Sequence, residues 1–147
     1  MLIQVALMLP PDAVSVPWAR HVVSAALTRA GVAAECVDDV EVAVSEACTN
    51  AYRHSSADGH YEVTMEIRDE HLTIDVLDSG VGFQQAQVPR AMSHVSAENG
   101  RGLALIAAYC DSALFDSVSG SGGAVHLNKR LRWVEGAPWS RLASAGS

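Results

Sequence analysis

The stretch YEVTMEIRDEHLTIDVLDSGVGF, residues 61–83, carries the clearest structural signal in the sequence. Hydrophobic and polar residues alternate in its first half and again after the polar link RDEH, as is typical of strands with one buried face. The apolar positions are Tyr61, Val63, Met65 and Ile67, then Leu72, Ile74 and Val76. A short link between two such runs predicts an antiparallel hairpin.

The segments on either side of this hairpin show further strand and helix patterns. Apolar residues that recur at helical spacing predict helices, and Gly31 is a typical stop after the first of them. The predicted elements outside the hairpin are a strand over 1–9, helices over 14–31 and 36–55, a loop over 84–99, a helix over 100–111 and two strands around the turn GSGG. Two helices therefore precede the hairpin, and one follows it.

This element order predicts the fold class. Strands that pair as hairpins, with helices gathered on one face, indicate an α+β two-layer sandwich rather than a doubly wound parallel sheet. A chain of 147 residues is the usual size of one domain with its own core. We expect a single domain over residues 1–134, followed by a tail over 135–147 that is rich in Ala, Ser, Gly and Pro and frays.

Composition and charge narrow the function classes. With 49% hydrophobic and 18% charged residues the chain is typical of a globular protein, and its net charge of -7 would repel a phosphate backbone, so we expect no direct nucleic-acid partner. Cys36, Cys48 and Cys110 form no C-x-x-C pair, which fits a reducing compartment. The apolar start ends at Pro10, too early for a signal peptide or a membrane span. We expect a cytoplasmic protein with no membrane association.

Three polar residues of the second predicted helix form a stripe. Glu46, Asn50 and His54 follow one another at i, i+4 and i+8, so they lie on one face of the helix. The residues predicted to pack on the sheet are Val40, Val44, Ala47, Cys48 and Ala51. The polar stripe could face a functional site, or it could be the solvated face that any surface helix has.

Two glycine-containing segments leave similar alternatives open. Asp78, Gly80 and Gly82 follow the hairpin and indicate either a simple turn or a place where the backbone opens to a ligand. The segment NGRGLAL, residues 99–105, is either an ordinary helix start or a helix N-terminus suited to phosphate. Neither a Walker P-loop nor a Rossmann glycine fingerprint is present.

Taken together, SEACTNAYRHS, DVLDSGVGF and NGRGLAL resemble the N, G1 and G2 boxes of the GHKL family, the Bergerat-fold ATP-binding proteins. The three segments occur in the family's order, on a predicted helix, a strand end and a helix start. The shared core runs from about Val40 to Arg130. The resemblance implies an ATP-binding domain with a mixed, mostly antiparallel sheet and helices on one face.

The resemblance also implies roles for matching positions. Asn50 corresponds to the residue that holds Mg²⁺ against the ATP phosphates, and Glu46 to the general base. Asp78 corresponds to the adenine anchor, and the glycines after it would let the backbone approach the nucleotide. The matching cofactor-binding positions are Asn50, Asp78, Gly80, Gly82, Gly100, Arg101, Gly102 and Leu103.

Within this family, the chain is most similar to bacterial anti-sigma factors that are also serine kinases, the RsbW and SpoIIAB type. That similarity implies a homodimer that sequesters an RNA polymerase sigma factor and phosphorylates a serine on a STAS-domain anti-anti-sigma factor. Arg20 matches a first-helix arginine at the partner interface. The alternative is a kinase-inactive nucleotide-binding regulator that acts only by protein–protein binding.

Two features near the C-terminal strands complete the sequence-based expectations. Where many relatives carry a threonine near the adenine, this chain has Gly123 and Ala124 in the turn GSGGAV. Lys129, Arg130 and Arg132 form a small basic cluster, which we interpret as a solvated strand edge rather than a nucleic-acid site.

Overall fold

The computed structural model describes residues 2–54, 59–78, 104–118 and 122–137. In chain order the elements are β1 (Leu2–Leu9), α1 (Ser15–Ala30), α2 (Ala34–His54), β2 (Tyr61–Arg68), β3 (His71–Asp78), β4 (Ser112–Val118) and β5 (Gly122–Arg130). Residues 104–109 are also helical. The first strand, the two long helices, the hairpin and the last two strands predicted from the sequence are thereby confirmed.

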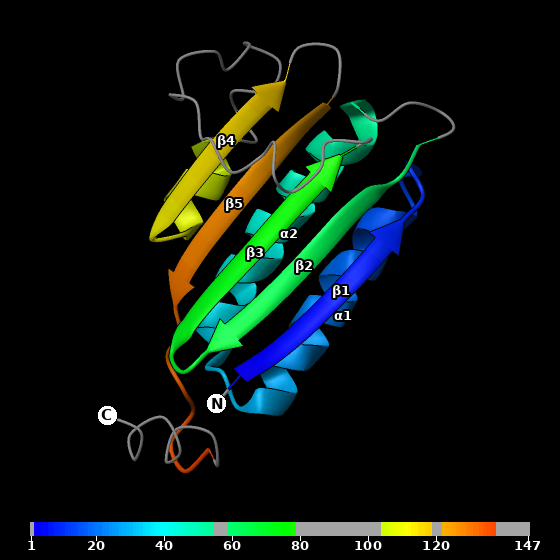
Figure 1. The fold of residues 1–147 in the computed structure, drawn as a ribbon. Helices are drawn as coiled ribbons and strands as arrows, with labels where there is room; N and C mark the ends of the chain where they lie inside the picture. Colours follow the sequence, from blue (N-terminus) through cyan, green and yellow to red (C-terminus); the bar gives the residue numbers. More distant parts are fainter. Residues whose placement is uncertain (1, 55–58, 79–103, 119–121, 138–147) are drawn as a thin grey trace.

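The five strands form one sheet in the order β1-β2-β3-β5-β4 (Figure 1). Every pair among these strands is antiparallel, so the described sheet is more uniform than the mixed sheet that the family resemblance implies. β2 and β3 form the predicted hairpin, with Tyr61 opposite Asp78. The strands β1 and β4 lie at the two edges.

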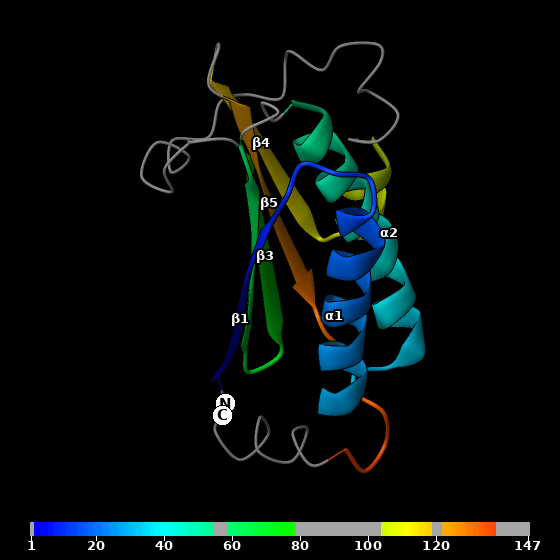
Figure 2. The same ribbon diagram turned by 90° about the vertical axis from the view of Figure 1, so that its right-hand side faces the viewer.

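Both long helices cover the same face of the sheet, as Figure 2 shows. The predicted α+β two-layer sandwich is therefore confirmed. The hairpin residues that face the helices are at most 2% exposed: Tyr61, Val63, Met65, Ile67, Leu72, Ile74 and Val76. This alternation follows from the pleat, which sends successive side chains to opposite faces. None of the helices in the described ranges is both long and apolar enough to cross a membrane.

The end of α1 is fixed by Gly31, which adopts a left-handed φ of 93° that favours glycine. A Cβ at this position would lie 2.6 Å from the Cβ of Ala137, and the Val134 amide donates a 2.7 Å hydrogen bond to the Gly31 carbonyl. Ala137, in the expected tail, therefore packs against the end of α1. The tail beyond Ala137 and the loop over 84–99 lie outside the described residues, and the domain boundary at 134 stays a prediction.

Candidate functional site

The helix α2 has one buried face and one polar flank. The residues predicted to pack on the sheet are at most 4% exposed: Val40, Val44, Ala47, Cys48 and Ala51. Glu46 and Asn50, one turn apart, are both half-exposed on the polar flank. The packing of α2 is confirmed, and it presents a carboxylate and an amide side by side. The side chain of His54 lies outside the described part of the structure.

Asp78 ends β3 as a buried acid, only 3% exposed. Its carboxylate oxygen Oδ1 accepts a 2.5 Å hydrogen bond from the backbone N–H of Gly123. A carboxylate is costly to bury unless it is hydrogen-bonded, and this backbone donor lowers that cost. The end of β3, the start of β5 and the C-terminal half of α2 lie at the same end of the sandwich (Figure 1). Asp78 and the polar flank of α2 are thus brought to one end of the fold.

A chain of buried polar groups connects this end of the fold to α1. The hydroxyl groups of Tyr61 and Ser15 share a hydrogen bond, and Ser15 Oγ donates a 2.6 Å bond to the Asp12 carbonyl. Burial raises the pKa of Tyr61 and of the neighbouring Cys48 thiol to about 12 each. Both groups are therefore neutral near pH 7 and stabilise the packing of α1, α2 and β2 through hydrogen bonds.

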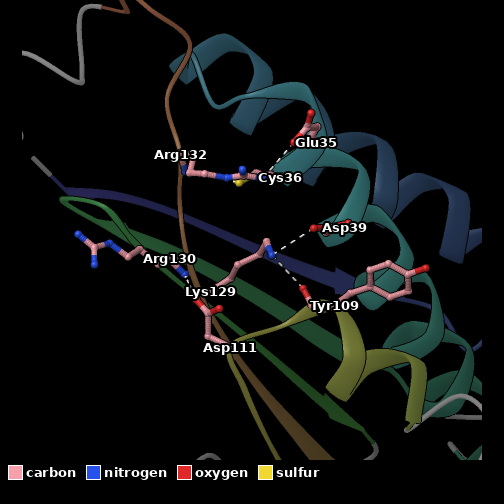
Figure 3. A network of polar contacts seen from close by, with 8 residues as sticks. All are labelled: Glu35, Cys36, Asp39, Tyr109, Asp111, Lys129, Arg130 and Arg132. Atoms are coloured by element: carbon pink, nitrogen blue, oxygen red, sulfur yellow. Dashed lines mark hydrogen bonds and ion pairs between the residues drawn. The ribbon is translucent and has the colours of Figure 1, made fainter.

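The basic cluster at the end of β5 forms ion pairs with other parts of the fold, and Figure 3 draws those of Lys129 and Arg132. The pairs are Lys129 with Asp39 at 3.3 Å, Arg130 with Glu70 at 3.1 Å and Arg132 with Glu35 at 3.3 Å. The side chains of Arg130 and Arg132 are 67% and 66% exposed, but that of Lys129 is only 13% exposed.

The prediction of a solvated strand edge is therefore wrong. β5 is an inner strand, between β3 and β4, and Lys129 is largely shielded from solvent. The cause is the strand period of two, because Lys129 falls on the same face as the buried residues Leu127 and Leu131. This alternation, visible in HLNKRL, was the sequence signal that could have identified the half-buried lysine.

The structure does not describe every candidate residue. Gly80, Gly82 and the segment Gly100 to Leu103 lie outside the described residues. Arg20 is exposed on α1, a different element from those that carry Glu46 and Asp78. Gly123, which the sequence marked only as a departure from the family, contacts Asp78 directly.

The fold is that of an ATP-binding domain of the histidine kinase-like class. The family described as "Histidine kinase-like ATPase domain" matches residues 9–129. The anti-sigma F factor of Clostridium beijerinckii is 31% identical over 124 residues, which cover 80% of this chain and 87% of that protein. The serine-protein kinase RsbW of Bacillus velezensis is 32% identical over 123 residues, 76% of this chain and 77% of that protein.

A solved structure gives the same fold. The crystal structure of the RsbU and RsbW domains of a Mycobacterium tuberculosis protein superposes with a TM-score of 0.67 at 20% identity, and covers 90% of this chain. This chain spans 34% of that longer one. The protein therefore belongs to the histidine kinase-like ATPase family, in the group that contains the anti-sigma F factors and RsbW.

Proposed function

We propose that this protein is an anti-sigma factor that binds ATP with Mg²⁺, sequesters an RNA polymerase sigma factor and phosphorylates a serine on a STAS-domain anti-anti-sigma factor. One observation carries the proposal. A buried, hydrogen-bonded Asp78 lies at the same end of a family fold as the half-exposed Glu46 and Asn50. The names of the relatives, anti-sigma F factor and serine-protein kinase, support the two halves of this function.

The adenine base is assigned to Asp78. A carboxylate can accept about four hydrogen bonds, so the bond from Gly123 is compatible with a further bond from the purine amino group. Because Asp78 is only 3% exposed, water competes weakly for its oxygens. Gly80 and Gly82 follow within four residues, and they would let the backbone approach the base and sugar.

The phosphates and the metal ion are assigned to the flank of α2 and to the segment Gly100, Arg101, Gly102 and Leu103. The side-chain oxygen of Asn50 fits Mg²⁺, which prefers oxygen ligands and often takes only one or two from the protein, with phosphates and waters supplying the rest. When bound, the ion would neutralise negative charge on the phosphates. Asn50 is half-exposed and one turn beyond Glu46, so it can reach a ligand without disturbing the core.

Glu46 is assigned the role of general base. Its carboxylate would accept the proton of the substrate serine while the serine Oγ forms a bond to the γ-phosphorus and the bond from phosphorus to the leaving ADP oxygen breaks. The half-exposed position of Glu46 suits this role, because a partner's serine has to reach it from solvent.

The partner surface is assigned to α1 around Arg20. Arg20 is exposed on this helix, on the flank opposite Trp18 and Arg29. The only charged residues of α1 are Arg20 and Arg29, in a chain whose net charge is -7. An exposed arginine at this position fits a partner segment that carries acidic side chains.

A homodimer through the edge of β1 is the assembly we propose. Among the described strands, β1 pairs only with β2, and its sequence LIQVALML contains no charged residue or proline. Edge strands without such protection readily pair with another strand. A second copy of β1, related by a two-fold axis, would extend the sheet in an antiparallel sense.

Two assays test the proposed function together. Titration with ATP and Mg²⁺ should show binding, and addition of the cognate STAS-domain protein should give phosphoserine and ADP. Failure to bind ATP would remove the nucleotide site altogether. ATP binding without phosphoserine would leave the kinase-inactive regulator as the function.

A further inference from the structure

The half-buried cation Lys129 has no role in the function proposed above, although its side chain is only 13% exposed. Its Nζ lies 3.3 Å from Asp39 Oδ2 on α2 and donates a 3.0 Å hydrogen bond to the carbonyl of Tyr109 (Figure 3). Tyr109 is the last residue of the helical segment 104–109. A single ammonium group therefore bridges α2 and the C-terminal end of this segment.

The helical segment 104–109 is fastened to β5 at that end by further bonds. The amide of Asp111 donates a 2.9 Å hydrogen bond to the Asn128 carbonyl, and the Asp111 carboxylate accepts one from the Arg130 amide. Ile106 is fully buried in the core. A cation at a helix C-terminus is also favourable, because the last carbonyl groups carry partial negative charge. The position of this segment is thus fixed from one end.

The other contact of Lys129 leads to the candidate site. Asp39 precedes Glu46 by seven residues and Asn50 by eleven, so all three lie within an arc of about 40° on the same flank of α2. Lys129 therefore ties the helix that carries the proposed base and metal ligand to the segment that follows Gly100 to Leu103 in sequence.

We propose that Lys129 is a positioning residue for the nucleotide phosphates. It does not touch the nucleotide, and it acts by fixing α2, which carries Glu46 and Asn50, against β5 and the segment 104–109. This inference rests on the proposed ATP-binding function. It predicts a defect that depends on phosphate, because the adenine anchor Asp78 lies on β3, whereas the bridge joins β5, α2 and the segment 104–109.

The test compares ATP with adenosine, which has the base and the sugar but no phosphate. Binding of each ligand is measured by calorimetry with Mg²⁺ for the wild type, Lys129→Met and Asp39→Asn, and the urea midpoint of each protein is recorded. We expect Lys129→Met to weaken ATP binding by about 10-fold and adenosine binding by less than 2-fold, which leaves a difference of at least about 1 kcal/mol for the phosphates. Asp39→Asn should weaken ATP binding in the same selective way by about 3-fold.

Two further variants sharpen the test. Arg130→Met removes the same charge one residue later, on a side chain that is 67% exposed, and it should leave both affinities unchanged. Lys129→Arg keeps the charge and should recover part of the ATP affinity. Equal losses for ATP and adenosine, or no loss, in Lys129→Met would overturn the proposal. If Lys129→Met does not fold, the ATP and adenosine affinities of Asp39→Asn test the proposal in its place. Wild-type protein that binds no ATP would instead contradict the proposed function.

Discussion

The backbone N–H of Gly123 donates a 2.5 Å hydrogen bond to Oδ1 of Asp78, and this bond joins the end of β3 to the start of β5. Because Leu77 pairs with Ala124 in the same ladder, the bond continues the strand pairing by one step through a side chain. The carboxylate is thereby held in one orientation before any ligand arrives. Such preorganisation reduces the entropy lost when a ligand binds.

Asp78→Asn should weaken ATP binding by about 1.5–3 kcal/mol, the cost of losing a hydrogen bond to a charged group. The amide of asparagine has the same shape, but only one of its two terminal atoms can accept a hydrogen bond. Calorimetry with ATP and Mg²⁺ measures the change. Asp75→Asn is the matched control, because Asp75 lies on the same strand, pairs with His126 and points to the other face of the sheet. Unchanged ATP affinity in Asp78→Asn would exclude the adenine assignment.

Glu46→Gln should reduce phosphorylation of the STAS-domain partner by about 10²–10⁴-fold while ATP still binds, since a positioned general base contributes on that scale. The measurement is phosphoserine formation under single-turnover conditions, with ATP affinity recorded on the same protein. Glu41→Gln serves as the control and should retain full activity, because Glu41 is a half-exposed glutamate like Glu46 but lies on another side of α2. A fully active Glu46→Gln enzyme would show that the serine proton goes elsewhere.

The contrast between Asp78 and Gly123 shows how far the sequence predicts this site. Asp78 could be predicted because it follows an alternating strand and precedes two glycines, a local pattern. Its partner Gly123 lies 45 positions further along the chain. A hydrogen bond over that separation depends on strand order, and β5 inserts between β3 and β4, which no local pattern specifies.

The groups shielded from solvent show a second limit of prediction from the sequence. The apolar face of α2 and the hairpin followed directly from periods of 3.6 and 2, and both are confirmed. Lys129 was misassigned because its charge suggested solvent, although its place in the strand period indicated the helix-covered face. The hydrogen bond between Tyr61 and Ser15 joins residues 46 positions apart, and no local sequence pattern indicates it.

Ala6→Asp should dissociate the proposed homodimer. Ala6 is exposed near the middle of β1, so antiparallel pairing about a two-fold axis would bring the two new carboxylates close together. We expect the dimer dissociation constant, measured by analytical ultracentrifugation, to rise by at least about 10-fold. Leu114→Asp places the same charge on the opposite edge strand β4, where Leu114 is 42% exposed, and it should leave the dimer intact. Dissociation by Leu114→Asp alone would assign the interface to β4.

Arg20→Glu should weaken binding to the cognate sigma factor by about 10-fold or more, because a charge reversal at an interface removes an attraction and adds a repulsion. The loss should be largest at low ionic strength, where exposed charges are screened least. Arg29→Glu is the control: it makes the same change on the opposite flank of α1, nine residues further along the helix. Equal losses in the two variants would indicate long-range attraction rather than a contact at Arg20.

The buried Cys48 and Tyr61 predict a loss of stability at alkaline pH. Burial raises their pKa from 9.0 and 10.0 to about 12 in the folded protein. Above about pH 9 the unfolded chain therefore releases these protons while the folded chain keeps them. Since stability falls with pH wherever the folded state binds more protons, the free energy of unfolding should decrease between about pH 9 and 12.

Urea titrations at pH 8, 9.5 and 11 measure this decrease against a double variant, Cys48→Ala with Tyr61→Phe. The double variant is expected to be less stable at pH 8, because it loses the hydrogen bond to Ser15, but to lose less of its remaining stability as the pH rises. Tyr109→Phe, which changes an exposed tyrosine, should behave like the wild type. If the double variant and the wild type show the same slope, the protons of Cys48 and Tyr61 are not the ones that folding retains.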